Sequence, residues 1–179
     1  DVQQKLAQHG LAGKDFIHIH PASRWLFKCW PSGHMTALIR ALQAQGQRIV
    51  ITAAPDAAEQ ALVRDMLAPL EQPVVDFSGQ LSLKQLAALT AMAKVFVGVD
   101  SAPMHIAAAM QTPVAVLFGP SGDLEWGPWR VPHRLLVSDH VCRPCGNDGC
   151  GGGKRSECLE AIPVERVLVS HGTPVLSGG

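Results

Sequence analysis

Short apolar runs alternate with amphipathic segments along most of the chain. The runs are rich in Val and Ile and predict strands at residues 16–20, 48–52, 74–77, 95–99, 113–118 and, with a weaker pattern, 135–138. Between them, apolar residues recur at three- and four-residue spacing and predict helices over residues 2–9, 34–45 and 102–110 and after Asp56, Ser82 and Pro163. Residues 95–99 are entirely apolar, as expected of a strand that is covered on both faces.

Two of these helices carry a start signal. Asp56 is followed three residues later by Glu59, and Ser82 is followed by Gln85. Each pair has the pattern of a capping box, in which the first side chain accepts from a first-turn amide and the second accepts from the capping residue's amide. We therefore expect helices to begin directly after Asp56 and Ser82.

The alternation of strands and helices predicts the fold class. It favours an α/β fold with an open parallel sheet, and right-handed crossovers make this a Rossmann-like doubly wound domain. Ligands of such sheets bind beyond the carboxyl ends of the strands. The candidate binding segments are therefore residues 20–28, 53–59, 79–82, 100–105 and 119–126.

The most informative segment is residues 97–105, where an apolar strand stops at Asp100 and a helix follows at once. First-turn amides without helical partners, together with the helix dipole, suit a phosphate at this point. Candidate ligand contacts are Asp100, Ser101, Ala102 and His105. The alternative is that Asp100 or Ser101 only caps the helix and that His105 is a core histidine.

A second segment, residues 20–31, follows the first strand. Ser23 offers a hydroxyl, and Arg24 and Lys28 offer cations, which is the set expected around a pyrophosphate. The alternative is a solvated loop with Trp25 and Trp30 as packing anchors. Glu59, after the second strand, is placed where an acid often accepts hydrogen bonds from a ribose. It also completes the predicted helix cap, and the two roles do not exclude each other.

Two phosphate-binding motifs are absent from the sequence. No predicted strand is followed by GxGxxG, which weighs against a nicotinamide dehydrogenase. The run of glycines at residues 151–153 before Lys154 lacks the preceding strand and the Ser or Thr of a P-loop.

Composition narrows the class further. The formal net charge is zero, with 17% charged residues, so nucleic acid is not an expected partner. No apolar run is long enough to span a bilayer and no signal-peptide pattern begins the chain, so we expect a cytoplasmic protein, with a peripheral place at the inner membrane left open. Four of the five cysteines offer a possible zinc site, namely Cys142, Cys145, Cys150 and Cys158. Their spacing is irregular, and the alternatives are reduced packing cysteines or a facultative disulfide. We expect no bound metal.

The sequence at residues 100–120 resembles the signature of glycosyltransferase family 9. Asp100-Ser101-Ala102-x-x-His105 is similar to the family's Asp-(Thr/Ser)-Gly-x-x-His, and it is followed by a small-residue helix and a strand that ends in Gly119-Pro120. Residues 23–31 are similar to the family's phosphate-binding loop. Residues 126–129 and the CxxC at 142–145 look most like the heptosyltransferase III branch.

The resemblance implies the C-terminal, donor-binding half of a GT-B-type enzyme. The donor would be ADP-L-glycero-D-manno-heptose, transferred with inversion to the lipopolysaccharide inner core, and no cofactor would be needed. Ser23 and Lys28 would touch the phosphates, Glu59 the ribose and Leu81 the adenine. The pyrophosphate and sugar would be lined by Asp100, Ser101, Ala102 and His105. Ala102 departs from the family's usual glycine, which narrows the approach of the phosphate to the backbone.

The family's general base lies in an N-terminal, acceptor-binding domain that these residues do not match. We therefore expect residues 1–179 to form the donor domain alone, to contain no catalytic base and to transfer no sugar without the other domain. Two other classes stay open: a nucleotide-sugar epimerase or non-catalytic nucleotide-binding module, and a zinc-stabilised interaction domain built around the cysteines.

Overall fold

Six parallel strands form one sheet in a computed structural model that describes residues 1–172. The sheet order is β3-β2-β1-β4-β5-β6, and every neighbouring pair is parallel. The strands are β1 (Phe16–His20), β2 (Arg48–Ile51), β3 (Val75–Asp76), β4 (Val95–Val99), β5 (Val114–Leu117) and β6 (His133–Leu136). The order reverses between β1 and β4, so the carboxyl ends of these two strands frame the crevice of a doubly wound sheet. The predicted fold class is confirmed.

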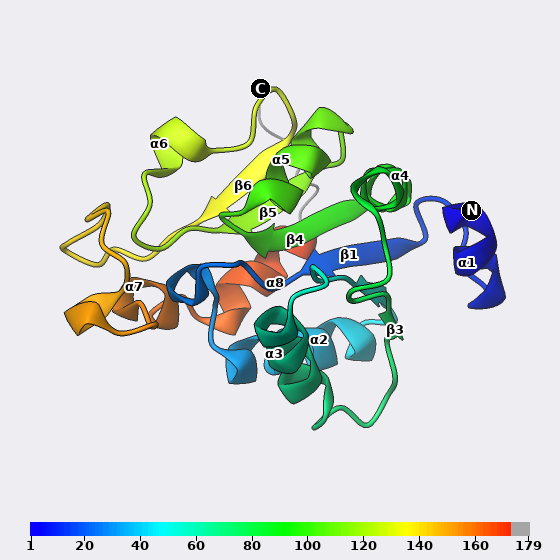
Figure 1. The fold of residues 1–179 in the computed structure, drawn as a ribbon, viewed down its shortest axis with the longest axis horizontal. Coiled ribbons are helices and arrows are strands. Elements are labelled where there is room, and N and C mark those ends of the chain that lie inside the picture. The colour runs from blue at the N-terminus through cyan, green and yellow to red at the C-terminus, as the bar shows by residue number, and fades with distance from the viewer. Residues whose placement is uncertain (173–179) are drawn as a thin grey trace.

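Helices cover both faces of this sheet (Figure 1). The main helices are α1 (Val2–Gln8), α2 (Ser32–Ala44), α3 (Ala57–Leu67), α4 (Leu83–Met92), α5 (Ala102–Ala109) and α8 (Val164–Gly172). Short helical turns complete the set: η1 (Leu26–Lys28), α6 (Asp123–Trp126), η2 (Cys150–Gly152) and α7 (Glu157–Glu160). Apolar residues of α2, α3 and α8 share one core cluster, and those of α1, α4 and α5 belong to two others.

Strand β4 shows why the sheet needs helices on both faces. Val95, Val97 and Val99 pack into the cluster of α2 and α3, whereas Phe96 packs into the cluster of α5. Successive side chains of a strand point to opposite faces, so an entirely apolar strand buries both. The same alternation sends Ile17 and Ile19 of β1 to the α2 side.

Most predicted elements are confirmed, with corrections at their ends. Strand β6 begins at His133 and ends at Leu136, whereas the pattern predicted residues 135–138. It is one of the two edge strands, and its first residue is exposed, which hides the strand pattern. The short helices α6 and α7 were not predicted, because four residues are too few for a periodic pattern.

The capping box at Ser82 and Gln85 is present in full. At α3, Asp56 accepts from the amides of Ala58 and Glu59, but the predicted second half of the box is wrong. The Glu59 carboxylate accepts instead from the amide of Ala54, at 3.1 Å, which turns it away from the helix end. Among the described residues, no helix is long and apolar enough to cross a membrane.

Candidate functional site

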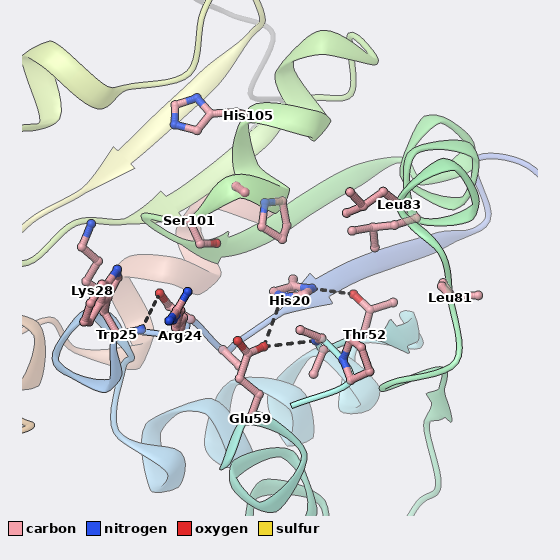
Figure 2. A pocket seen from close by; sticks show the side chains of 18 of the residues that line it. His20, Arg24, Trp25, Lys28, Thr52, Glu59, Leu81, Leu83, Ser101 and His105 are labelled. Atoms are coloured by element: carbon pink, nitrogen blue, oxygen red, sulfur yellow. Dashed lines mark hydrogen bonds and ion pairs between the residues drawn. The ribbon is translucent and has the colours of Figure 1, made fainter. Parts of the chain in front are cut away.

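A cavity of about 700 Å³ opens at the carboxyl ends of β1, β2 and β4. Its wall contains each of the eight residues proposed from the sequence: Ser23, Lys28, Glu59, Leu81, Asp100, Ser101, Ala102 and His105. Figure 2 shows Arg24, Trp25 and Lys28 on one side of this cavity and Thr52, Leu81 and Leu83 on the other, with His20 and Glu59 between them. The structure therefore brings together segments that lie up to 82 positions apart in the chain, from Ser23 to His105.

An ion pair joins two of these segments. The Nζ atom of Lys28, in η1, lies 2.6 Å from Oδ2 of Asp100, at the end of β4. The Asp100 side chain is only 8% exposed, whereas that of Lys28 is 24% exposed. A buried carboxylate needs such a partner, since an unpaired charge is costly to remove from water. The lysine therefore balances Asp100 while its ammonium group still borders the cavity.

The N-terminus of α5 faces the same cavity without a side-chain cap. Ser101 is the N-cap residue, but its hydroxyl donates to the Val99 carbonyl at 3.2 Å, and no described side chain caps the helix. Ser101 is thus the N-cap residue, as the alternative interpretation had it, but neither its side chain nor that of Asp100 caps the helix. His105 is exposed, so its interpretation as a core histidine is wrong. A helix end of this kind carries partial positive charge and suits an anion.

Glu59, in α3, also lines the cavity. It is 5% exposed, and its Oε2 atom accepts from the Ala54 amide and lies 4.0 Å from Nε2 of His20. The Asp56 side chain caps α3, so the Glu59 carboxylate is not used as a helix cap. Its carboxylate is thus held at the cavity wall.

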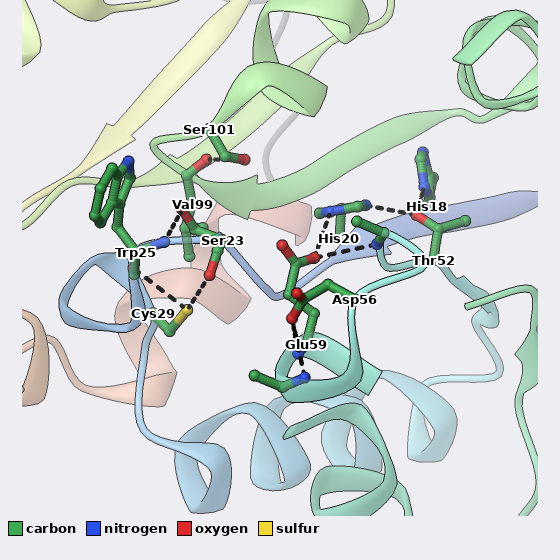
Figure 3. Close-up of polar contacts among 12 residues, drawn as sticks. His18, His20, Ser23, Trp25, Cys29, Thr52, Asp56, Glu59, Val99 and Ser101 are labelled. Atoms are coloured by element: carbon green, nitrogen blue, oxygen red, sulfur yellow. Dashed lines mark hydrogen bonds and ion pairs between the residues drawn. The ribbon is translucent and has the colours of Figure 1, made fainter. Parts of the chain in front are cut away.

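Behind Glu59 lies a polar network that the sequence analysis missed. Thr52 Oγ1 lies 2.7 Å from Nε2 of His18 and 2.8 Å from Nδ1 of His20 (Figure 3). Thr90 Oγ1 lies 3.1 Å from Nδ1 of His18. Burial lowers the pKa of His20 to about 4. Burial, followed by the neighbouring His20, lowers the pKa of His18 well below its ordinary value. Both rings are therefore neutral near pH 7. The available signal was the pair of histidines two positions apart on β1, on the same face of the strand.

Ser23 is buried, and its hydroxyl accepts from the Trp25 amide at 3.2 Å. Burial raises the pKa of the nearby Cys29 thiol to about 11. Trp30 is a packing anchor, as the alternative for this segment had it, with Nε1 donating to the Ile162 carbonyl at 3.2 Å. Trp25 is not an anchor, because it is 53% exposed, and it lines the cavity instead.

Apolar residues form the remaining wall. Leu81 is partly buried, Leu86 is 7% exposed and Leu83 is 73% exposed, and all three line the cavity. A leucine as exposed as Leu83 beside a cavity is an apolar surface available to a flat ring. Only Leu81 was proposed from the sequence, because Leu83 and Leu86 fit the apolar stripe of a helix.

The four clustered cysteines do not contribute to this cavity. Cys158 is buried and Cys142 is exposed, and the thiols are free. Within residues 1–172, no group of three or more His, Cys, Asp or Glu side chains is arranged to hold a metal ion. Arg143, beside Cys142, donates to the Gly119 carbonyl just after β5 and to Asp123 Oδ1 in α6, both at 2.8 Å.

Residues 1–154 match the family described as glycosyltransferase family 9 (heptosyltransferase). The chain belongs to glycosyltransferase family 9. It is 39% identical over 122 residues to lipopolysaccharide heptosyltransferase 3 of Escherichia coli, a match that covers 68% of this chain and 36% of the relative. The signature residues 100–120 and the phosphate-loop residues 23–31 both fall inside the part that matches the family.

Two solved structures share the fold over nearly the whole chain. The structure of E. coli ADP-heptose lps heptosyltransferase II is 25% identical, with a TM-score of 0.79, and the match covers 98% of this chain and 51% of that one. The family 9 glycosyl transferase from Veillonella parvula is 22% identical, with a TM-score of 0.82 and coverage of 99% and 51%. The chain thus spans about a third of the curated relative's length and about half of each solved chain.

Proposed function

We propose that this family 9 chain binds ADP-L-glycero-D-manno-heptose as the donor-binding domain of an inverting, GT-B-type heptosyltransferase. The observation that carries the proposal is the single cavity that contains an uncapped helix N-terminus, a lysine, a wall carboxylate and an apolar shelf. These are the groups that a nucleoside diphosphate sugar requires: positive charge for phosphate, an acceptor for ribose hydroxyls and an apolar surface for a base. The names of the E. coli relatives support a heptose donor and a lipopolysaccharide acceptor.

Each part of the donor has a place in this cavity. The diphosphate lies against the start of α5, with Ser23 and Lys28 as side-chain donors. The ribose lies at Glu59, and the adenine packs on Leu81. The sugar and pyrophosphate are bordered by Asp100, Ser101, Ala102 and His105. Ala102 is exposed and lines the cavity, so its methyl group narrows the approach of the phosphate to the backbone.

The chemical role of this domain is to stabilise the leaving group. When an acceptor hydroxyl attacks the anomeric carbon from the opposite face, the bond to the β-phosphate oxygen breaks and negative charge grows on ADP. The amides at the start of α5 and the ammonium group of Lys28 stabilise that charge, and they are in place before the reaction begins. No cofactor takes part.

The general base comes from an acceptor-binding domain and not from this chain. Asp100 is paired with Lys28, and Glu59 accepts from Ala54, so both carboxylates are held at the donor wall. The acceptor is the lipopolysaccharide inner core. Such an enzyme works in the cytoplasm, and the membrane-bound acceptor brings it to the inner membrane surface.

Acceptor-dependent release of ADP tests the proposal. ADP-heptose and a lipopolysaccharide core acceptor are incubated with the chain alone and with the chain plus the N-terminal half of a related heptosyltransferase. We expect donor binding by the chain alone and ADP release only with both halves and acceptor present. Turnover by the chain alone would place the base here, and conversion of the donor without acceptor would favour an epimerase instead. Donor binding without release under any condition would favour a non-catalytic module; the relatives named above support neither alternative.

A further inference from the structure

The hydrogen-bond chain behind the cavity determines where the protons of its two histidines lie. Thr90 Oγ1 lies 2.8 Å from the Leu86 carbonyl, a distance at which the hydroxyl proton must lie between the two oxygens. Thr90 therefore has no proton left for His18 and can only accept from it. His18 consequently carries its proton on Nδ1, and its Nε2 is an acceptor.

The same reasoning passes through Thr52 to His20. Because Nε2 of His18 lacks a proton, the 2.7 Å contact with Thr52 requires the Thr52 hydroxyl to donate to it. Thr52 then has only lone pairs for His20, so Nδ1 of His20 donates to Thr52 at 2.8 Å. Burial keeps His20 neutral, and its Nε2 is therefore a bare acceptor.

That acceptor faces the cavity beside a second one. Nε2 of His20 lies 4.0 Å from Oε2 of Glu59, too far for a hydrogen bond, and the chain of threonines leaves no proton between them. Among the described residues, this nitrogen makes no hydrogen bond, and His20 and Glu59 both line the cavity (Figures 2 and 3). Two acceptors side by side are satisfied by a ligand that brings two donors.

We propose that His20 is a specificity-determining residue, whose Nε2 atom accepts a hydrogen bond from one hydroxyl of a ligand diol while Glu59 accepts from the neighbouring hydroxyl. The inference rests on the proposed function, in which the diol is that of the ribose of ADP. A ribose offers two adjacent hydroxyls, each with one proton to donate. Thr52 and His18 act through His20 as positioning residues, because they fix which ring nitrogen is bare.

The chain of contacts offers a matched pair of variants. An asparagine amide at position 20 reaches to the Nδ1 position and still donates to Thr52, but it has no atom at the Nε2 position. A glutamine places its oxygen near the Nε2 position and loses the bond to Thr52. H20N therefore removes only the cavity acceptor, and H20Q retains it.

Affinities for ADP, 2′-deoxy-ADP and 3′-deoxy-ADP are measured by calorimetry with the 179-residue wild type and both variants. We expect the wild type to prefer ADP over at least one deoxy analogue by roughly two- to tenfold, the range for one neutral hydrogen bond. In H20N the preference for ADP over the deoxy analogues falls to the part that Glu59 contributes by itself, whereas H20Q retains most of the wild-type preference. Equal weakening of all three ligands in H20N, with the ratios unchanged, would show that His20 only shapes the wall and would overturn the inference.

The remaining outcomes are distinguishable. If ADP does not bind the wild type, the proposed function fails and the inference fails with it. If H20N leaves the ADP ratios unchanged but weakens ADP-heptose, the diol belongs to the heptose and the ribose assignment is wrong. Nitrogen-15 spectra of the histidines in the wild type test the proton positions without any variant: we expect a proton on Nδ1 and none on Nε2 for both His18 and His20, and a proton on Nε2 of His20 would overturn the proposal.

Discussion

Replacing Lys28 with alanine tests the phosphate side of the cavity. Lys28 has two partners in this account: the carboxylate of Asp100, 2.6 Å away, and the diphosphate of the ligand. K28A removes the cation and at the same time leaves the Asp100 carboxylate, 8% exposed, without its partner beside the phosphate site. The variant should therefore bind ADP worse for two reasons, and only one of them is a lost contact.

The two contributions can be separated in magnitude. A charge-assisted hydrogen bond to phosphate contributes about 1.5–3 kcal/mol, which is about 10- to 150-fold in Kd. We expect K28A to lie at the upper end of that range, because the uncovered carboxylate repels the diphosphate as well. The double variant K28A/D100N removes that repulsion, so its affinity should recover toward the lower end of the range.

Calorimetry with ADP and adenosine measures the effect, since adenosine has the base and ribose but no phosphate. We expect the Kd for adenosine to be nearly unchanged in K28A. Lys154→Ala is the matched control, because Lys154 is exposed, lies outside the cavity wall and makes the same change in net charge. Equal losses for ADP and adenosine would refute the reasoning and mean that Lys28 only shapes its loop.

Three further predictions concern stability and the region outside the cavity. The pKa of His20 is about 4 in the folded chain and ordinarily 6.5, so between pH 6.5 and 4 the unfolded chain binds more protons than the folded one, and the free energy of unfolding should fall by about 3 kcal/mol over that window. Denaturant melts of the wild type should show this loss and those of H20N a smaller one, and an equal dependence of stability on pH in both would contradict the prediction. Gly98→Ala should cost about 1–3 kcal/mol of stability, because the added Cβ would lie 2.6 Å from Cε1 of Phe96; an unchanged melt would show that the ring moves aside freely. Changing the four clustered cysteines (Cys142, Cys145, Cys150 and Cys158) to serine should leave the Kd for ADP within a factor of a few. Stoichiometric zinc whose removal by a chelator also unfolds the chain would contradict the interpretation of these thiols as metal-free.

The sequence was sufficient to predict the sheet and the edge at which the site lies. Period and composition mark the buried strands, and parallel strands bring their carboxyl ends to one edge, so loops at Ser23, Glu59 and Asp100 had to meet there. That rule explains why all eight proposed residues line one cavity. Their roles in binding remain predictions.

Pairings between those loops could not be predicted. Lys28 and Asp100 lie 72 positions apart, and nothing in either segment identifies the other as its partner. The missing side-chain cap at α5 could not be predicted either, because a serine before a helix is a frequent cap, whereas here the Ser101 hydroxyl turns back to the Val99 carbonyl. The His18 and His20 network depends on which strand neighbours β1, which is decided by topology and not by local sequence.

Titration of the 179-residue chain with ADP, UDP, GDP and NAD tests the central claim most directly, that this cavity is an ADP-sugar site. We expect ADP to bind most tightly, since the apolar shelf at Leu81 and Leu83 accepts adenine and the α5 end accepts a terminal diphosphate. Binding should weaken in K28A and stay unchanged in K154A. Preference for NAD, or equal affinity for the four ligands that K28A does not alter, would contradict the account.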